Sequence, residues 1–146
     1  MHTDKHRLKK GIIAALFVCS SIYSYGQDVR TEHVIDKQLN ACLDSAENQT
    51  TLGMIECTIR AEDLWDVELN KYYKLLMGVL NKEQKILLKD AQVKWLAYRD
   101  SELNLSSDIY YGMEGTMWRI VYADRRMEIV KKRAEELRIY YEALKL

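Results

Sequence analysis

A single repeated spacing in the C-terminal third of the chain sets the strongest limit on how it folds. Nine apolar residues there follow one another at intervals of three or four positions. They are Met117, Ile120, Ala123, Met127, Val130, Ala134, Leu137, Tyr141 and Leu144. On an α-helix this spacing places all the side chains along one face. The pattern predicts a helix of about 30 residues, roughly 45 Å long, whose apolar seam packs inside a bundle.

The rest of the chain predicts further helices and no strand. It contains no proline, and no segment shows the period-2 alternation that is typical of a strand. We expect helices over residues 34–47, 52–80 and 82–104, followed by a long loop over 106–115. Because the connection after residue 80 is short, the second and third helices should form an antiparallel hairpin. The inward residues of the third helix are predicted to be Leu87, Leu88, Ala91, Trp95 and Tyr98. The predicted fold class is all-α, an antiparallel bundle of three long helices plus a short N-terminal helix.

The N-terminus has the composition of a secretory signal peptide. A cluster of three lysines and one arginine precedes an apolar run of ten residues, which is too short to span a bilayer comfortably. Ser24 and Gly26 are small residues of the kind that a signal peptidase requires. We therefore expect cleavage before Gln27.

Such cleavage defines a signal peptide over residues 1–26 and one domain over 27–146, exported to the periplasm or secreted. Two alternatives stay open. The segment could remain as a short membrane anchor, or lipid could be attached at Cys19, although the four residues ending there match a lipobox only loosely. The membrane is expected to be contacted only through this segment.

Two cysteines, Cys42 and Cys57, remain in the expected mature chain. An even number of cysteines in an exported chain indicates a disulfide, because the compartment is oxidising. Two cysteines without nearby histidines make a poor metal site. We therefore predict one disulfide and no metal.

The sign of the charge changes along the expected mature chain. Residues 27–70 contain 3 basic and 10 acidic residues, whereas residues 71–146 contain 15 basic and 11 acidic residues. The acidic half could steer a cationic partner towards the chain, although solvated helix faces carry such charges without any partner. Neither half has the basic patch that would indicate nucleic-acid binding.

The residue types of common catalytic sites are largely missing. His33 is the one histidine expected in the mature chain, and there is no glycine-rich phosphate loop. An acidic cluster could be interpreted as an acid/base pair, but on an amphipathic helix it more often forms a solvated face. Its members are Glu62, Asp63, Asp66 and Glu68. We predict neither an enzyme nor a cofactor.

Two blocks of mixed polar and aromatic residues form the most specific pattern. One block reads W-D-V-E-L-N-K-Y-Y over residues 65–73, and the other reads A-Q-V-K-W-L-A-Y-R-D over residues 91–100. Within each block the polar residues recur at helical spacing and so share a face. We predict that they satisfy one another's hydrogen bonds in a buried helix interface, with ligand contact as the alternative. The predicted polar network consists of Asp66, Asn70, Gln92, Trp95, Arg99 and Asp100.

The order of these elements resembles the LprI-type lysozyme inhibitor domain. The shared pattern is a Cys followed about 15 residues later by a second Cys, then W-D-x-E-L-N-x-x-Y, then A-Q-x-x-W-x-x-Y-R-D, and it covers about residues 39–137. The resemblance implies a small exported helical protein that inhibits lysozyme. It also implies a second cysteine pair in many members, at positions taken here by Leu103 and about Arg125.

The predicted function is that of a periplasmic, lysozyme-inhibitor-like binding protein that protects the cell wall. Its candidate partner contacts are Glu62 and Asp63 on the acidic helix and Tyr110 and Tyr111 on the predicted loop. Two adjacent tyrosines provide contact area suited to an interface, and the alternative is that they only cover the end of the bundle. A helical envelope adaptor without lysozyme inhibition is the alternative function.

Overall fold

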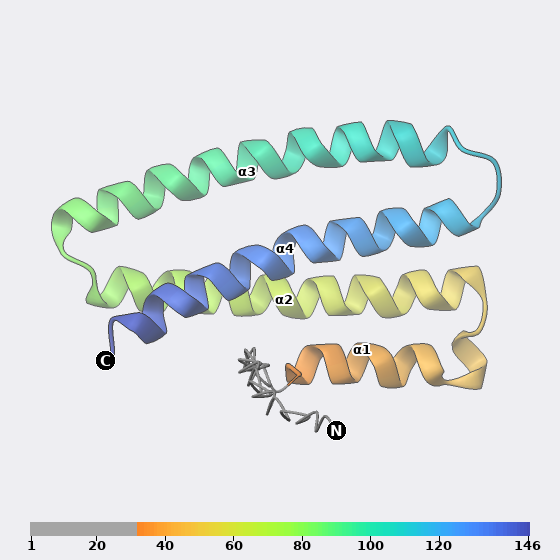
Figure 1. The fold of residues 1–146 in the computed structure, drawn as a ribbon, viewed down its shortest axis with the longest axis horizontal. Coiled ribbons are helices and arrows are strands. Elements are labelled where there is room, and N and C mark those ends of the chain that lie inside the picture. Colours follow the sequence, from red (N-terminus) through yellow and green to blue (C-terminus); the bar gives the residue numbers. More distant parts are fainter. Residues whose placement is uncertain (1–31) are drawn as a thin grey trace, which may run out of the picture. The chain divides into compact units, whose positions relative to one another are not determined.

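The computed structural model describes residues 32–146, so the expected signal peptide and Cys19 lie outside the described residues. Within residues 32–146 the chain forms four α-helices and no strand (Figure 1). These are α1 (Val34–Asp44), α2 (Thr51–Val79), α3 (Lys82–Tyr111) and α4 (Met117–Ala143), with a 3₁₀ turn (Ala46–Asn48) between α1 and α2. The prediction of an all-α fold with three long helices and a short N-terminal one is confirmed.

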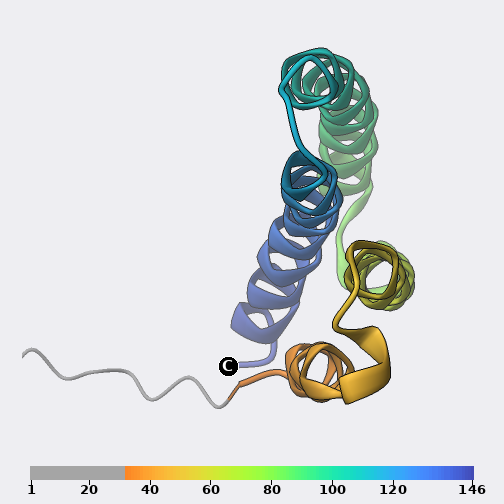
Figure 2. The same cartoon turned by 90° about the vertical axis from the view of Figure 1, so that its right-hand side faces the viewer.

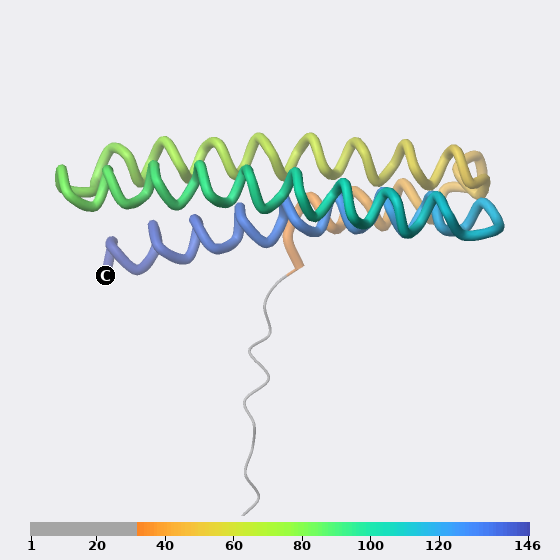
Figure 3. The backbone as a smooth tube through the Cα atoms, turned by 90° about the horizontal axis from the view of Figure 1, so that it is seen from above, coloured from red at the N-terminus to blue at the C-terminus, as the bar shows by residue number. Residues whose placement is uncertain are grey.

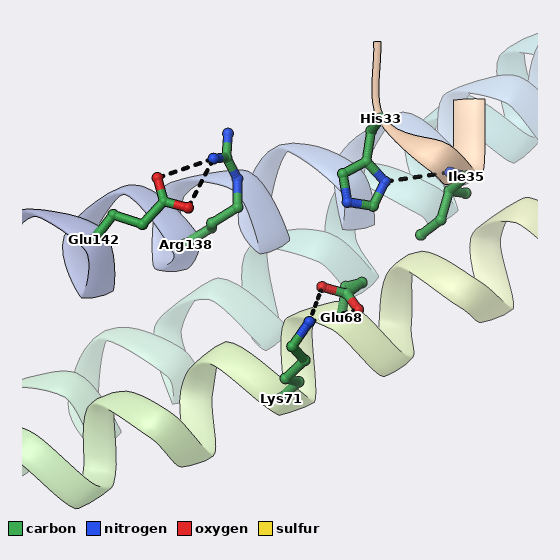
Figure 4. Close-up of polar contacts among 6 residues, drawn as sticks. All are labelled: His33, Ile35, Glu68, Lys71, Arg138 and Glu142. Carbon is green, nitrogen blue, oxygen red and sulfur yellow. Dashed lines mark hydrogen bonds and ion pairs between the residues drawn. The ribbon is translucent and has the colours of Figure 1, made fainter. Parts of the chain in front are cut away.

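Side-chain caps fix where the helices begin. The Thr50 hydroxyl accepts a hydrogen bond from the Gly53 N–H at 3.0 Å and starts α2. Asn81 accepts a hydrogen bond from the Gln84 N–H at 2.8 Å, and the Gln84 side chain accepts one from the Asn81 N–H at 3.1 Å. This capping box starts α3. At α1, His33 Nδ1 accepts a hydrogen bond from the Ile35 N–H at 3.3 Å (Figure 4).

The core lies mainly between α2 and α4, which run alongside each other in Figure 1. Trp65 and Leu76 of α2 and Leu137 of α4 are among its most deeply buried side chains. Burial of each such side chain contributes roughly 1.5–3 kcal/mol. The predicted seam of α4 is buried at its centre, whereas its two ends, Met117 and Leu144, are exposed.

Helix α1 covers the N-terminal half of α2 and is attached to it covalently. The predicted disulfide between Cys42 and Cys57 joins the two helices. Lys131 of α4 donates a hydrogen bond to Asp36 of α1 at 2.8 Å, and its ammonium lies 5.5 Å from the centroid of the Trp65 ring. These contacts close the core around Trp65.

The predicted long loop over 106–115 is wrong, because α3 continues to Tyr111 and leaves only a short connection, 112–116. Ser106 is accommodated inside the helix because its hydroxyl donates to the Glu102 carbonyl at 2.8 Å. Gly115 has φ +93°, a left-handed conformation that glycine adopts without strain.

The expected antiparallel hairpin of α2 and α3 is present, but α3 packs mainly on α4, so the two helices of the hairpin are not in close contact. The two helices run antiparallel, but the end-on view in Figure 2 shows α3 standing apart from α2 and lying against α4. A helix that contacts one neighbour buries only a narrow stripe. Leu88 is therefore buried and Trp95 half-buried, while the predicted inward residues Leu87, Ala91 and Tyr98 are exposed. None of the helices in residues 32–146 combines the length and apolarity needed to cross a membrane.

Candidate partner-binding groove

The separation of α2 and α3 leaves a groove between them with a volume of about 430 Å³. Figure 3 shows its two walls, α2 and α3, running antiparallel from one end of the helical domain to the other. Most of the residues singled out in the two sequence blocks line this groove. Its lining consists of Asp66, Leu69, Asn70 and Tyr73 from α2, and Lys89, Gln92, Val93, Trp95, Leu96 and Arg99 from α3.

The α2 wall carries an exposed carboxylate and amide held together by helical spacing. The Asn70 amide nitrogen donates to Asp66 Oδ2 at 2.9 Å and to the Asp66 carbonyl at 2.8 Å. This bond fixes the direction of both side chains. Each side chain remains exposed to solvent, so the remaining lone pairs of the Asp66 carboxylate are accessible to a partner.

The α3 wall carries a guanidinium between an aromatic ring and a carboxylate. Arg99 Nη2 donates to Asp100 Oδ1 at 2.8 Å, and the guanidinium lies 5.5 Å from the centroid of the Trp95 ring. Arginine stacked on an aromatic face is a common arrangement in binding surfaces, because it is weakly hydrated and keeps free N–H donors. Val93 and Leu96 add exposed apolar area to this wall.

Gln92 connects the α3 wall to α4. Its Oε1 accepts a hydrogen bond from Nε of Arg133 at 3.1 Å, and Arg133 Nη1 donates to Glu136 at 3.0 Å. Sequence reasoning missed Arg133, which lies beside the apolar seam of α4 and is buried although it is charged. No sequence signal marks it, because a charged residue at such a position is more often solvated.

The polar residues of the two blocks thus lie along the same groove without forming the buried network that we expected. Within residues 32–146 no hydrogen bond joins the α2 members to the α3 members. Asp66, Asn70 and Asp100 are exposed rather than buried. The physical reason is the separation of α2 from α3, which leaves water access between the walls.

The acidic residues Glu62 and Asp63 lie one helical turn before Asp66 on α2. Glu62 accepts a hydrogen bond from Arg126 of α4 at 3.1 Å, and its side chain is 15% exposed. Burial raises the pKa of the Glu62 carboxyl above its usual range, although the positive charge of Arg126 acts in the opposite direction. Asp63 is exposed and takes part in no ion pair with another residue of the described chain.

Comparison with known families bears directly on this arrangement. A family model described as "Lysozyme inhibitor LprI" matches residues 42–137. The chain belongs to the LprI family. The matched region begins at the disulfide-bonded Cys42 and ends at the fully buried Leu137, so it includes both walls of the groove.

One solved structure is similar to this LprI chain over most of its length. It is a crystal structure of an uncharacterized protein from Burkholderia thailandensis, with a TM-score of 0.72 and 29% sequence identity over 76% of this chain. The present chain spans about half of that protein, 54% of its length. A search of curated proteins gives no match.

The LprI resemblance implies a second cysteine pair in many members. The corresponding positions here are Leu103 on α3 and about Arg125 on α4. Glu102, which precedes Leu103, accepts a hydrogen bond from Arg125 across these two helices. The Arg125 guanidinium has its pKa raised by this bond. In this LprI domain an ion pair therefore connects the helices at the place where other members are expected to have a covalent bond.

The two tyrosines predicted on a loop belong to the last turn of α3 in this LprI domain. Tyr110 stacks on Trp118 with ring centroids 6.0 Å apart, and Tyr111 meets Tyr122 edge-on at 5.4 Å. Both partners are in α4. These contacts place the tyrosines over the end of the α3–α4 pair, and Tyr111 stays exposed.

Proposed function

We propose that this protein is an exported lysozyme-inhibitor-like protein that binds its target through the α2–α3 groove and the acidic turn beside it. The observation that carries the proposal is the position of the two sequence blocks. Their polar side chains line an open groove instead of being buried and hydrogen-bonded to one another in a closed helix interface. Family membership supports lysozyme as the class of partner.

The groove combines the chemistry that a protein interface needs. Trp95 and Arg99 belong to the residue types that dominate binding energy in interfaces. Val93 is 66% exposed and Leu96 37% exposed, so a partner would remove apolar area from water on binding. The carboxylates of Asp63 and Asp66 lie at the edge of this apolar area.

Charge supports the choice of a cationic partner. Residues 51–70 of α2 contain five acidic residues and one basic residue. Many lysozymes are cationic, so this part of α2 would accelerate association, and the effect would weaken as salt screens it. We assign no catalytic role to any residue.

Export to the periplasm or secretion is part of the proposal. The N-terminal sequence has the features of a signal peptide. The disulfide between Cys42 and Cys57 is of the kind that persists in an oxidising compartment. There the inhibitor would protect the cell wall from muramidases.

The test is a titration of the exported, purified protein into lysozymes of several classes, with lysis of cell walls as the readout. It is run at about 0.01 M and about 0.15 M ionic strength. Stoichiometric inhibition that is stronger at the lower ionic strength is the expected result. Absence of inhibition for every class would reject the proposal and favour the envelope adaptor, for which the exposed end of α4 (Ile139, Tyr140 and Leu144) is available.

Two variants locate the contact. Reversal of charge at the groove, Asp63→Lys with Asp66→Lys, should weaken inhibition. The control, Asp44→Lys with Glu47→Lys, makes the same change in net charge at exposed residues near the end of α1. An equal loss of lysozyme inhibition in both double variants would show that only net charge matters, and it would contradict the groove as the binding site.

A further inference from the structure

A second pocket lies between the end of α2, the start of α3 and the end of α4, and we call it the C-terminal pocket. Its volume is about 470 Å³. Figures 2 and 3 show why it forms there, because α4 turns away from α3 towards its C-terminal end and the two helices diverge. Its lining residues all differ from those of the α2–α3 groove, so it is a separate site.

The walls of the C-terminal pocket are mainly apolar. Leu76 of α2 and Leu88 of α3 are buried, at 1% and 8% exposure. Leu87, Tyr140 and Leu144 line the same pocket and are each more than half exposed. A ligand with an apolar chain would remove this exposed area from water, which favours binding. The volume is in the range of small-molecule sites, which combine apolar walls with a few polar groups.

One buried cation, Arg133 of α4, lines this pocket. Its side chain is 9% exposed. Nε donates to Gln92 and Nη1 donates to Glu136, whereas within residues 32–146 Nη2 has no hydrogen-bond partner and is shielded from solvent. Buried polar groups in folded proteins nearly always have a partner. An unpartnered guanidinium nitrogen on a residue that lines a pocket therefore indicates a ligand that supplies the acceptor.

The positive charge of Arg133 is only weakly compensated. The side chain of Glu136, its ion-pair partner, is 55% exposed, and ion pairs in water contribute little. Gln92 carries no charge. By contrast, Arg138 further along α4 donates to both carboxylate oxygens of Glu142 at 3.0 Å, as Figure 4 shows. The charge of Arg133 therefore favours a ligand with an anionic head group.

We propose that the C-terminal pocket binds a long-chain fatty acid as its carboxylate. The head group accepts a hydrogen bond from Arg133 Nη2 and displaces the exposed Glu136 from Nη1, which gives the two-point bond typical of a guanidinium and a carboxylate. The chain lies along α4 towards Leu144. Leu144 is 11 residues from Arg133, or roughly 16 Å, which an extended chain of about 12 carbons spans. This site is independent of the proposed lysozyme inhibition.

Isothermal titration calorimetry at neutral pH, below the micelle-forming concentration of each ligand, tests the site. The natural protein should bind decanoate at least about tenfold more tightly than decan-1-ol, because the alcohol lacks the charge that pairs with the guanidinium. From octanoate to dodecanoate, each added CH₂ should tighten binding about two- to fourfold. Failure to bind any of these carboxylates, or equal binding of decanoate and decan-1-ol, would overturn the proposal.

Two variants separate the head group from the chain. Arg133→Met should bind decanoate about tenfold more weakly and should bind decan-1-ol as the natural protein does, so that the selectivity for the carboxylate is lost. Leu87→Gln should weaken the binding of both ligands. Its control, Ile86→Gln, changes the adjacent residue of α3, which is 60% exposed and outside the pocket lining, and should bind both ligands normally.

A third variant, Glu136→Gln, should bind decanoate more tightly, because it removes the carboxylate that competes for Arg133. Circular dichroism establishes that each variant is folded. Unchanged selectivity in Arg133→Met, weaker binding by Glu136→Gln, or equal losses in Leu87→Gln and Ile86→Gln would contradict the site. Lysozyme inhibition is measured separately and should be retained in Leu87→Gln, so that failure of the pocket and failure of the proposed function are distinguished.

Discussion

Arg133 Nε lies 3.1 Å from Gln92 Oε1 and joins α4 to α3 beneath the groove. The Arg133 side chain is 9% exposed, and within the described chain its Nη2 has no hydrogen-bond partner. A buried guanidinium with an unsatisfied N–H group costs free energy. Gln92 and Glu136 offset this cost, so the position of α3 depends on an interaction that is only partly satisfied.

Replacement of Gln92 by Leu should lower the free energy of unfolding by about 1–3 kcal/mol, because it removes the acceptor of a buried charged group. Replacement of Arg133 by Met should have a much smaller effect, because the charge leaves the interior together with its desolvation cost. The double variant should recover most of the stability lost in Gln92→Leu. Urea unfolding of the four proteins measures this cycle, and strictly additive losses would contradict it.

Removal of the disulfide should destabilise the domain. The Cys42–Cys57 bond closes a loop with a sequence separation of 15, for which the chain-entropy estimate is about 3 kcal/mol. The variant Cys42→Ser with Cys57→Ser should melt at a lower temperature than the natural protein. Dithiothreitol should lower the melting temperature of the natural protein and leave that of the variant unchanged.

Gly53 and Gly78, both in α2, should respond in opposite ways to alanine. A Cβ at Gly53 would lie 2.7 Å from the Cα of Asn48, so Gly53→Ala should destabilise the domain by about 1–3 kcal/mol. A Cβ at Gly78 meets nothing within 4 Å, so Gly78→Ala should stabilise α2 by about 0.5–1 kcal/mol. Thermal unfolding compares the two, and equal shifts would refute the steric explanation.

Glu62 should make stability depend on pH in an unusual direction for a carboxylate. Its folded-state pKa is raised above the reference value of 4.5 by burial, so the folded state binds more protons than the unfolded state between these two values. The contribution of Glu62 to folding stability is therefore fully present below pH 4.5 and is lost as the pH rises through the folded-state pKa. The stability of Glu62→Gln relative to the natural protein should increase from about pH 4 to about pH 7. Urea unfolding across this range would contradict the idea if the difference stayed constant or declined.

The pair Leu103→Cys with Arg125→Cys should form a disulfide between α3 and α4. Arg125 already bonds to Glu102, so the two helices approach each other at this place. The closed loop would add about 3 kcal/mol of stability on the chain-entropy estimate. Thiol titration and thermal unfolding with and without reductant measure the outcome, and persistent free thiols in the folded protein would contradict it.

Local sequence was sufficient to predict the helices and the disulfide. The Asn81 capping box and the seam of α4 are determined by residues a few positions apart, whose interactions form within one helix. The two cysteines could be paired by counting once export was assumed. Helical spacing also singled out five residues that line the groove, although it predicted them in a closed interface: Asp66, Asn70, Gln92, Trp95 and Arg99.

The neighbour of each helix was decided only by the tertiary structure. Tyr98 and Leu87 have the apolar character of core residues, but they are exposed because α3 contacts α4 along a single stripe. The burial of Arg133 likewise depends on Gln92, which is 41 positions away in the sequence. Helical periodicity indicates which residues share a face, but the free energy of packing that face depends on segments distant in the sequence. Because α3 packs on α4 rather than on α2, Asp66 and Arg99 line an open groove instead of a closed interface.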